Sequence, residues 1–304
     1  MIKASIDIGS NSVLLLAGEY KNGVVRELLN ESRITGLGEN IDRDKRFSES
    51  SMVNTYSVLE EYKDLLNNIS LSSENTIVTA TEASREVTNA KDFFERVKSN
   101  LGFNIFLISS EGEAYYTAKG LMNSVTNSQK NEFIIMDIGG ASTELIKVVK
   151  NPFAIVETIS LKMGSVRSTD WIATNQYEKE LAINLSHPAL KNFQCAEIIC
   201  VAGTMVSLAG LLLNLKAFLQ DAIEGSHFSI SELESLEKKL ISMTPEAINA
   251  EFPFLGKRSQ TISGGAQISL ALQKALGVEM IVISTYGLRY GTLIAGGIDE
   301  QFII

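Results

Sequence analysis

The feature that most constrains this chain is a repeated motif in which an apolar strand ends in an aspartate and a glycine-bearing turn follows. The first copy is Ile-Asp-Ile-Gly-Ser-Asn-Ser at residues 6–12, and the second is Met-Asp-Ile-Gly-Gly-Ala-Ser-Thr at residues 136–143. Mostly apolar runs also follow the turns, at 13–17 and 145–149. Each copy therefore predicts a hairpin of two strands joined at a glycine turn.

Both turns carry groups that suit an anion. Glycine permits a tight turn whose successive backbone N–H groups can converge on a phosphate, and serine and threonine hydroxyls add donors. A Walker A or Rossmann site would need a helix directly after the glycines, and neither copy shows one. A single such loop is commonly an ordinary β-turn, but two copies predict two phosphate loops facing one cleft. The predicted phosphate-binding positions are Gly9, Ser10, Asn11, Ser12, Gly139, Gly140, Ala141, Ser142 and Thr143.

Length and charge set the broad class. The 304 residues allow one large or two medium domains with a buried core. The formal net charge of −9 argues against nucleic acid or an anionic membrane as a partner. The longest apolar stretch, 201–215, contains Gly, Thr, Ser and Asn, so it predicts a buried strand and helix rather than a membrane span. With no signal-peptide pattern at the N-terminus, a cytoplasmic location is expected.

Cysteine and histidine usage excludes two other kinds of site. Cys195 and Cys200 are the only cysteines and flank an apolar run, which predicts buried, reduced thiols. His187 and His227 lie far from them and from any partner motif. The chain therefore shows neither a zinc pattern nor a Ser-His-Asp arrangement.

The order of predicted elements repeats once along the chain. Strands come first, at 24–33 after the first hairpin, and helices alternate with strands afterwards; the same order begins again at residue 133. We expect an α/β fold of two duplicated domains, 1–119 joined by the C-terminal helix of 285–304, and 120–284. Ser48 is predicted to cap one further helix, and a capping box at Ser231 predicts another that ends at Ile241. The other predicted helices are 90–101, 166–173, 176–185, 204–213, 265–275 and 288–295. The other predicted strands are 76–80, 105–108, 197–201 and 280–283.

Five further segments complete a recognisable pattern. They are Thr-Ala-Thr-Glu-Ala-Ser-Arg at 79–85, Ile-Ser-Ser-Glu-Gly-Glu-Ala at 108–114, Ser-Leu-Lys-Met-Gly-Ser-Val-Arg at 160–167, Val-Ala-Gly-Thr at 201–204 and Ser-Thr-Tyr-Gly-Leu-Arg at 284–289. With the two loops, they make the chain resemble the exopolyphosphatase/guanosine pentaphosphate phosphohydrolase (Ppx/GppA) family of the actin, Hsp70 and sugar kinase superfamily, in its short two-domain form. The resemblance implies two ribonuclease H-like (actin-like ATPase) domains with a cleft between them.

The same resemblance implies a reaction. Water would remove the terminal phosphate of inorganic polyphosphate or the 5′ γ-phosphate of guanosine pentaphosphate, with Mg²⁺ or alternatively Mn²⁺. Glu113 matches the catalytic glutamate that orients or deprotonates water. Asp137 and Glu144 match the metal-associated acids, and Asp7 would help through a water. The plainer alternatives are a glutamate stabilised by the dipole of its helix and an aspartate that satisfies turn amides.

Because the net charge is negative, cationic side chains near the site must supply the attraction for an anionic substrate. The resemblance assigns phosphate binding to Arg85, Lys162, Arg167, Arg289, Gly203 and Thr204, with Lys257 and Arg258 as an outer patch. A solvated surface role is the alternative for each cation. The expected partners are polyphosphate or guanosine penta- or tetraphosphate, without nucleic acid or membrane, and related short proteins suggest a homodimer.

Several positions depart from the family pattern: Leu14, Tyr115, Ala141, Gln260 and Tyr290. The first two replace cationic residues, which predicts weaker phosphate attraction and poorer processing of long polyphosphate. Two rival functions stay open at this point. One is a small-molecule kinase of the same superfamily, and the other is a non-catalytic sensor of guanosine tetra- or pentaphosphate.

Overall fold

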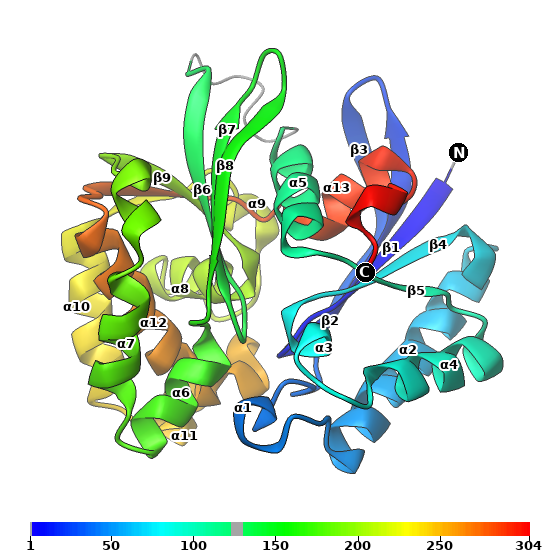
Figure 1. Ribbon diagram of the computed structural model, residues 1–304, viewed down its shortest axis with the longest axis horizontal. Coiled ribbons are helices and arrows are strands. Elements are labelled where there is room, and N and C mark those ends of the chain that lie inside the picture. The colour runs from blue at the N-terminus through cyan, green and yellow to red at the C-terminus, as the bar shows by residue number, and fades with distance from the viewer. Residues whose placement is uncertain (1, 123–129) are drawn as a thin grey trace. The chain divides into compact units, whose positions relative to one another are not determined.

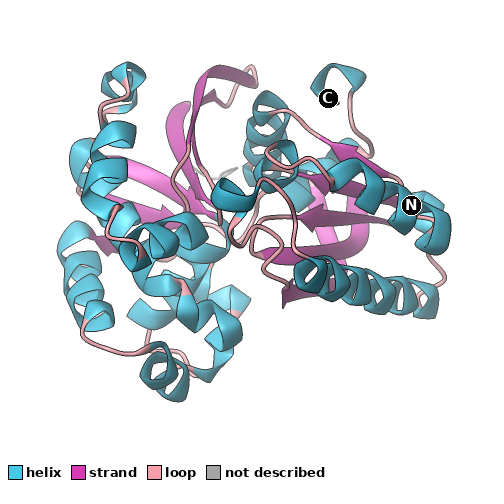
Figure 2. Ribbon diagram, turned by 60° about the horizontal axis from the view of Figure 1, so that its bottom comes forward, coloured by secondary structure: helices cyan, strands magenta, loops and turns pink. Residues whose placement is uncertain are grey.

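The computed structural model describes residues 2–122 and 130–304. The chain divides into two compact units, Met1–Thr126 with Tyr286–Ile304 (unit 1) and Asn127–Thr285 (unit 2). Each unit is built of a mixed β-sheet with helices packed against it, and helices flank the strands in each (Figures 1 and 2). The domain boundary predicted after residue 119 lies inside helix α5 (Ser110–Leu121), ahead of this division.

Unit 1 contains a five-stranded sheet in the order β3-β2-β1-β4-β5. Its strands are β1 (Ile2–Ile8), β2 (Ser12–Lys21), β3 (Val24–Ile34), β4 (Thr76–Ala80) and β5 (Ile105–Leu107). Its helices are α1 (Ile41–Asp44), α2 (Glu49–Asn68), η1 (Ser73–Asn75), α3 (Glu82–Arg85), α4 (Ala90–Leu101), α5, α13 (Leu288–Ala295) and η5 (Glu300–Phe302). Helices α5 and α13 lie on one side of the sheet, and α2 and α4 on the other (Figure 1).

Strand β1 is the central strand of this sheet, and its middle residues are therefore buried on both faces. It pairs antiparallel with β2 and parallel with β4, so the predicted first hairpin is confirmed. Ala4, Ile6 and Ile8 are buried, and the intervening Ser5 is buried too and shares a 2.6 Å hydrogen bond with Thr292 of α13. Residues 2–8 alternate apolar and polar side chains in the sequence, and the burial of Ser5 shows that the middle of the strand is nevertheless covered on both faces.

Helix α2 starts where the sequence predicts. The Ser48 hydroxyl accepts a 3.1 Å hydrogen bond from the backbone N–H of Ser51, which satisfies one of the unpaired amides of the first turn. Leu59, Tyr62 and Leu66 are buried at steps of three and four residues, so they form the stripe that packs on the sheet.

Unit 2 contains a six-stranded sheet in the order β10-β11-β9-β6-β7-β8. Its strands are β6 (Glu132–Ile138), β7 (Thr143–Val149), β8 (Ala154–Leu161), β9 (Glu197–Val201), β10 (His227–Ser229) and β11 (Met280–Ile283). Its helices are α6 (Ser165–Ala173), α7 (Tyr177–Leu185), η3 (Pro188–Phe193), α8 (Ala202–Leu212), α9 (Gln220–Ile223), α10 (Ile230–Ile241), α11 (Pro245–Glu251), η4 (Pro253–Gln260) and α12 (Ile262–Ala275).

The two units repeat one strand arrangement. Strand β6 pairs antiparallel with β7 and parallel with β9, as β1 pairs with β2 and β4. The third strand of each unit also joins with a shift in register, next to Gly18 in unit 1 and Val148 in unit 2. The predicted duplication of an α/β unit is therefore confirmed.

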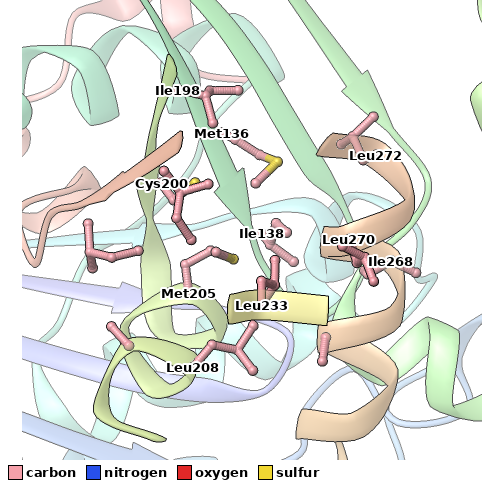
Figure 3. Packing of buried hydrophobic residues seen from close by; sticks show 14 of the residues in the cluster. Met136, Ile138, Ile198, Cys200, Met205, Leu208, Leu233, Ile268, Leu270 and Leu272 are labelled. Atoms are coloured by element: carbon pink, nitrogen blue, oxygen red, sulfur yellow. The ribbon is translucent and has the colours of Figure 1, made fainter. Parts of the chain in front are cut away.

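The core of unit 2 lies between its sheet and helices α8, α10 and α12 (Figure 3). Met136 and Ile138 of β6 and Ile198 and Cys200 of β9 point to this side because alternate residues of a strand share a face. Both cysteines are free; Cys200 is fully buried as predicted, whereas Cys195 is partly exposed, contrary to the prediction. None of the described helices combines the length and apolar character that crossing a membrane requires.

Several helix starts in unit 2 differ from the sequence prediction by one to three residues, and two of them have a clear physical cause. The capping box of α10 is formed by Ser229 and Glu232 and not by Ser231, because the three-residue strand β10 ends at Ser229 and sets the helix start. Helix α12 begins at Ile262 although Gly264 and Gly265 disfavour a helix. A Cβ on Gly265 would lie 2.6 Å from the Thr204 methyl carbon, so close helix packing outweighs propensity there.

Candidate active site

The strand registers of unit 1 bring its predicted site residues to one edge of the sheet. Asp7 lies opposite Thr79 of the parallel strand β4, and Ala80 lies opposite Leu107 of β5. The first loop (residues 9–11), helix α3 and helix α5 therefore all begin at the carboxyl ends of adjacent strands. In open α/β sheets this is the edge where ligands bind.

The first loop is held by its own hairpin and by residues 35–38. The Gly9 N–H donates to the Ser12 carbonyl at 3.0 Å, which closes the turn. The Gly38 N–H donates to the Ser10 carbonyl at 2.6 Å, and a Cβ on Gly38 would lie 2.8 Å from the Ser10 Cβ. Ser10 is consequently buried, and the loop has a fixed shape before any ligand arrives.

A left-handed backbone does not explain the first glycine of either loop. Gly9 and Gly139 both have φ outside the positive range, contrary to the conformational reason expected from the sequence. A Cβ would lie 3.2 Å from the Ser12 carbonyl oxygen in the first loop, which is a tight contact, and 3.4 Å from that of Ser142 in the second, which is an ordinary one. Ala141 also avoids positive φ, so the loss of a glycine there causes no backbone strain.

Glu113 lies on α5 and is held by Arg85, whose side chain is 11% exposed. The helix starts at Ser109, whose hydroxyl accepts a 3.1 Å hydrogen bond from the Gly112 N–H. The Nη2 of Arg85 donates to Oε2 of Glu113 at 3.0 Å and to Oε2 of Glu82 at 2.8 Å. Its Nη1 donates to the Ile108 carbonyl at 2.7 Å. Arg85 thus joins the end of β4 to the segment that positions Glu113.

Burial changes the proton affinity of Glu113. Its carboxyl is 9% exposed, and loss of hydration raises its pKa above the ordinary value of 4.5. The positive charge of Arg85 opposes this increase, while the nearby Glu82 carboxylate adds to it. A carboxylate with a raised pKa is a better proton acceptor than an exposed one, as a general base requires.

The second loop lies in unit 2, where the first residues of α6 hold it in place. The Gly139 N–H donates to the Ser142 carbonyl at 3.0 Å, repeating the turn of the first loop. The backbone N–H groups of Ser165 and Val166 donate to the carbonyls of Gly139 and Gly140, both at 2.9 Å. The side chain of Arg167 donates to the Ala141 carbonyl.

Arg167 is 4% exposed, and its side chain bonds to the backbone of the loop. Phosphate binding by Arg167, which the family resemblance implies, stays a prediction. Gly164 packs equally closely, because a Cβ there would lie 2.4 Å from the Gly140 carbonyl group. Thr143 is also used inside the protein, donating through Oγ1 to the Met163 carbonyl at 2.6 Å.

Two predicted metal-associated acids form a cross-strand pair. Asp137 of β6 lies directly opposite Glu144 of β7, so their side chains lie on the same face of the sheet. Glu144 is buried and accepts a 2.8 Å hydrogen bond from Ser160. Like charges at opposed positions destabilise a sheet unless a cation or proton compensates them. The pair fits a hard divalent cation bound through carboxylates, waters and substrate oxygens.

The pair does not form a complete protein cage. Within residues 2–122 and 130–304, three or more His, Cys, Asp or Glu side chains nowhere gather as metal ligands. In unit 1 the position opposite Asp7 is Leu14, so the first hairpin lacks the second acid. Mg²⁺ is commonly held by one or two carboxylates with substrate phosphates, which matches this incomplete set.

Gly203 and Thr204 start helix α8, beside the second loop. Asp137 pairs with Val201, the last residue of β9, so the helix begins at the same sheet edge. Ala202, between Val201 and Gly203, has φ of 67°, a left-handed conformation that costs a non-glycine residue about 1–2 kcal/mol. Strain of this kind marks a junction whose shape the surrounding structure imposes.

Arg258 is closer to this junction than its sequence position suggests. It is expected in an outer patch, yet its Nη1 donates to the Gly203 carbonyl at 3.0 Å and to the Ser207 hydroxyl at 2.9 Å. Burial lowers its pKa to about 10, so it remains charged at neutral pH. No local pattern reveals this position, because η4 places it over α8 from 55 residues away.

The other predicted cations differ in their surroundings, and Lys257 is exposed. Lys162 follows β8 and is exposed at the edge of the second loop, since Leu161 lies opposite Thr143. Arg289 is half-buried and donates through Nη1 to the carbonyls of Leu15 and Glu31, at 3.2 and 3.3 Å. These two hydrogen bonds join α13 to β2 and β3.

The departures Tyr115 and Tyr290 have structural explanations. The Tyr115 ring stacks on Phe302 near the C-terminus with ring centroids 5.1 Å apart. Tyr290 is fully buried, and its hydroxyl donates to Glu27 at 2.7 Å. Both aromatic side chains pack within unit 1.

Comparison with known proteins agrees with this arrangement. The profile described as the Ppx/GppA phosphatase family matches residues 18–296. A crystal structure described as the Aquifex aeolicus member of the Ppx/GppA protein family is 28% identical, with a TM-score of 0.77 and 97% of each chain covered. The two units therefore have the two-domain, actin-like fold of that family.

Three curated relatives carry informative names. The exopolyphosphatase 2 of Mycobacterium tuberculosis is 27% identical over 95% of this chain and 96% of its own length. A bifunctional 3-dehydroquinate synthase/phosphatase of Fusobacterium nucleatum is 28% identical over 97% of this chain. A guanosine-5′-triphosphate,3′-diphosphate pyrophosphatase of Vibrio cholerae is 28% identical over 91%. The matches span only 46% and 59% of these last two proteins. From its fold, its paired loops and the family profile, the chain belongs to the Ppx/GppA phosphatase family.

Proposed function

We propose that this chain is a metal-dependent phosphohydrolase that releases the terminal phosphate of inorganic polyphosphate or the 5′ γ-phosphate of guanosine pentaphosphate. One observation carries most of the weight: Glu113, at the edge of the unit 1 sheet, is buried and bonded to Arg85 through only one of its two oxygens. The described contacts leave Oε1 to accept a hydrogen bond from water. The names of the curated relatives agree with this substrate class.

The roles of the site residues follow from their positions. Glu113 orients the attacking water and accepts its proton. The first loop in unit 1, and the second loop and the start of α8 in unit 2, bind phosphate oxygens. Lys162 and Arg258 supply positive charge near the second loop, and Arg167 keeps that loop in shape. Phosphoryl transfer depends mainly on such positioning and charge neutralisation.

Asp137 and Glu144 would hold the divalent cation, with Asp7 contributing through a water. The cation would neutralise phosphate oxygens in the transition state. Mg²⁺ is the expected ion because both side chains offer hard carboxylate oxygens, and Mn²⁺ is the alternative.

The variant Glu113→Gln tests the proposal. It keeps the shape of the side chain but cannot accept the proton, so phosphate release should fall by roughly 100-fold or more while substrate binding is retained. The control is Glu111→Gln, an exposed carboxylate in the first turn of the same helix, which should leave turnover unchanged. Full turnover by Glu113→Gln would remove this residue from the mechanism.

Substrate and metal are tested in one assay of phosphate release. Polyphosphate, guanosine pentaphosphate and ATP are compared with Mg²⁺, with Mn²⁺ and with a chelator. Release from one of the first two substrates that stops with the chelator supports the proposal. ADP formed only with a sugar or carboxylate would indicate a kinase, and tight nucleotide binding without release would indicate a sensor. The expected cytoplasmic location and homodimer stay predictions.

A further inference from the structure

Arg85 contacts two buried carboxylates, and only one of them belongs to the proposed mechanism. Glu82 and Glu113 each present Oε2 to the same Nη2 nitrogen, at 2.8 and 3.0 Å. Both acids are buried, at 7% and 9% exposure. Their registers explain the meeting, since α3 and α5 follow adjacent parallel strands.

The donors of Arg85 are largely used inside this cluster. A guanidinium has five N–H groups. Glu82 accepts from Nε at 3.2 Å as well as from Nη2, so one carboxylate oxygen fixes the guanidinium fork from one side. The Ile108 carbonyl accepts from Nη1, and Glu113 accepts from Nη2, the nitrogen that it shares with Glu82. Glu82 is therefore the residue that sets the rotation of Arg85.

We infer that Glu82 is a positioning residue for the phosphohydrolase reaction: it orients Arg85 so that the guanidinium holds Oε2 of Glu113 and turns Oε1 toward the attacking water. This inference rests on the function proposed above. Two carboxylates share one cation, so the charge of Glu82 also bears on how readily Glu113 keeps its proton. The residues facing Glu113 in this cluster are Arg85 and Glu82.

Removing the charge of Glu82 has a defined consequence for pH dependence. In Glu82→Gln the side chain retains an oxygen acceptor for Arg85, but the negative charge that raises the pKa of Glu113 is gone. The charge of Arg85 is then balanced by Glu113 alone. The pKa of Glu113 falls, and the acid limb of the kcat/KM profile moves to lower pH.

The experiment measures pH profiles of phosphate release for wild type, Glu82→Gln and the control Glu86→Gln. Glu86 follows Arg85 directly, and its carboxylate lies 3.8 Å from the Lys45 ammonium group. The expected result is an acid limb displaced downward in Glu82→Gln only, with a smaller change in KM than in kcat. Circular dichroism confirms that each variant is folded.

The possible failures can be told apart. If Glu113→Gln is inactive while Glu82→Gln keeps the wild-type acid limb, the role of Glu82 is refuted and the proposed function stands. If Glu113→Gln is active, the proposed function itself fails. If Glu82→Gln does not fold, Glu82→Asp retains the charge but shortens the reach to Arg85. Lower kcat with a nearly unchanged acid limb is then expected, and wild-type kcat would overturn the inference.

Discussion

At the scale of single residues, the proposed base is buried at an energetic cost. A carboxylate that loses its hydration is destabilised unless charges and hydrogen bonds replace the lost water. Arg85 replaces part of it for Glu113, and the pKa of Glu113 nevertheless stays above 4.5. Catalytic placement and fold stability therefore oppose each other at this position.

This opposition predicts the effect of pH on stability. Because the folded state raises the pKa of Glu113, folding favours the protonated acid, and its contribution is fully present below pH 4.5 and lost as pH rises through the folded pKa. Glu113→Gln has no such loss. Its free energy of unfolding in urea should therefore gain on that of wild type as pH rises from acid to neutral. A constant difference across pH would contradict this.

Sequence reasoning located site residues better than their contacts. The acids and glycines at strand ends were predictable because they interrupt apolar runs. The hydrogen bond from Arg167 to the second loop was not predictable. An arginine in a motif that is expected to bind phosphate fits that pattern whether its side chain contacts phosphate or the backbone of the loop. The position of Arg258 depends on a long-range contact that no local pattern encodes.

At the scale of elements, α5 depends on the last residues of the chain. The Ser109 N–H, at the start of this helix, donates to the Phe302 carbonyl at 2.8 Å. The Phe302 ring contacts Tyr115 and Tyr116, with ring centroids 5.1 and 5.7 Å away. Gly112 leaves room for it, because a Cβ there would lie 2.7 Å from the Phe302 Cβ. The helix that carries Glu113 is thus packed against the C-terminal segment.

Phe302→Ala should loosen the start of α5. Loss of two aromatic contacts of a half-exposed ring is expected to lower the free energy of unfolding by about 1–2 kcal/mol. Amide hydrogen exchange at Ser109 should become faster, and kcat should fall more than KM rises. Ile304→Ala, an exposed position two residues later, is the control and should be neutral. Unchanged exchange at Ser109 would show that Phe302 does not support the helix.

Several elements were predictable to the residue from their local pattern, and strand β10 was not. The strands at 76–80, 197–201 and 280–283 and the helices at 90–101 and 288–295 have the bounds predicted from the sequence. Strand β10 has three residues and exists because β11 offers it a partner. Tertiary pairing of this kind carries too little local signal to be read from the residues alone.

At the scale of the whole molecule, the net charge of −9 opposes an anionic substrate that extends beyond the site. Guanosine pentaphosphate would interact mainly with the local cations, whereas a long polyphosphate chain would also pass over acidic surface. The two substrates should therefore respond differently to ionic strength. The sequence predicts the sign of this field, because it follows from composition alone.

Salt titration provides the test. At constant free Mg²⁺, added NaCl screens the attraction of local cations for both substrates but also the repulsion felt by the long chain. The value of kcat/KM should consequently fall less steeply for long polyphosphate than for guanosine pentaphosphate. A steeper fall for the long chain would reveal a basic track along the surface that the net charge conceals.

The unequal hairpins have one more consequence. Asp137 has an acid across from it, while Asp7 has Leu14 at the matching place. The halves of this protein share an architecture but have diverged in chemistry, and a single aliphatic side chain accounts for the difference at these paired positions. A single substitution of Leu14 by an acidic residue would therefore give the first hairpin the same pair of opposed acids that the second hairpin has.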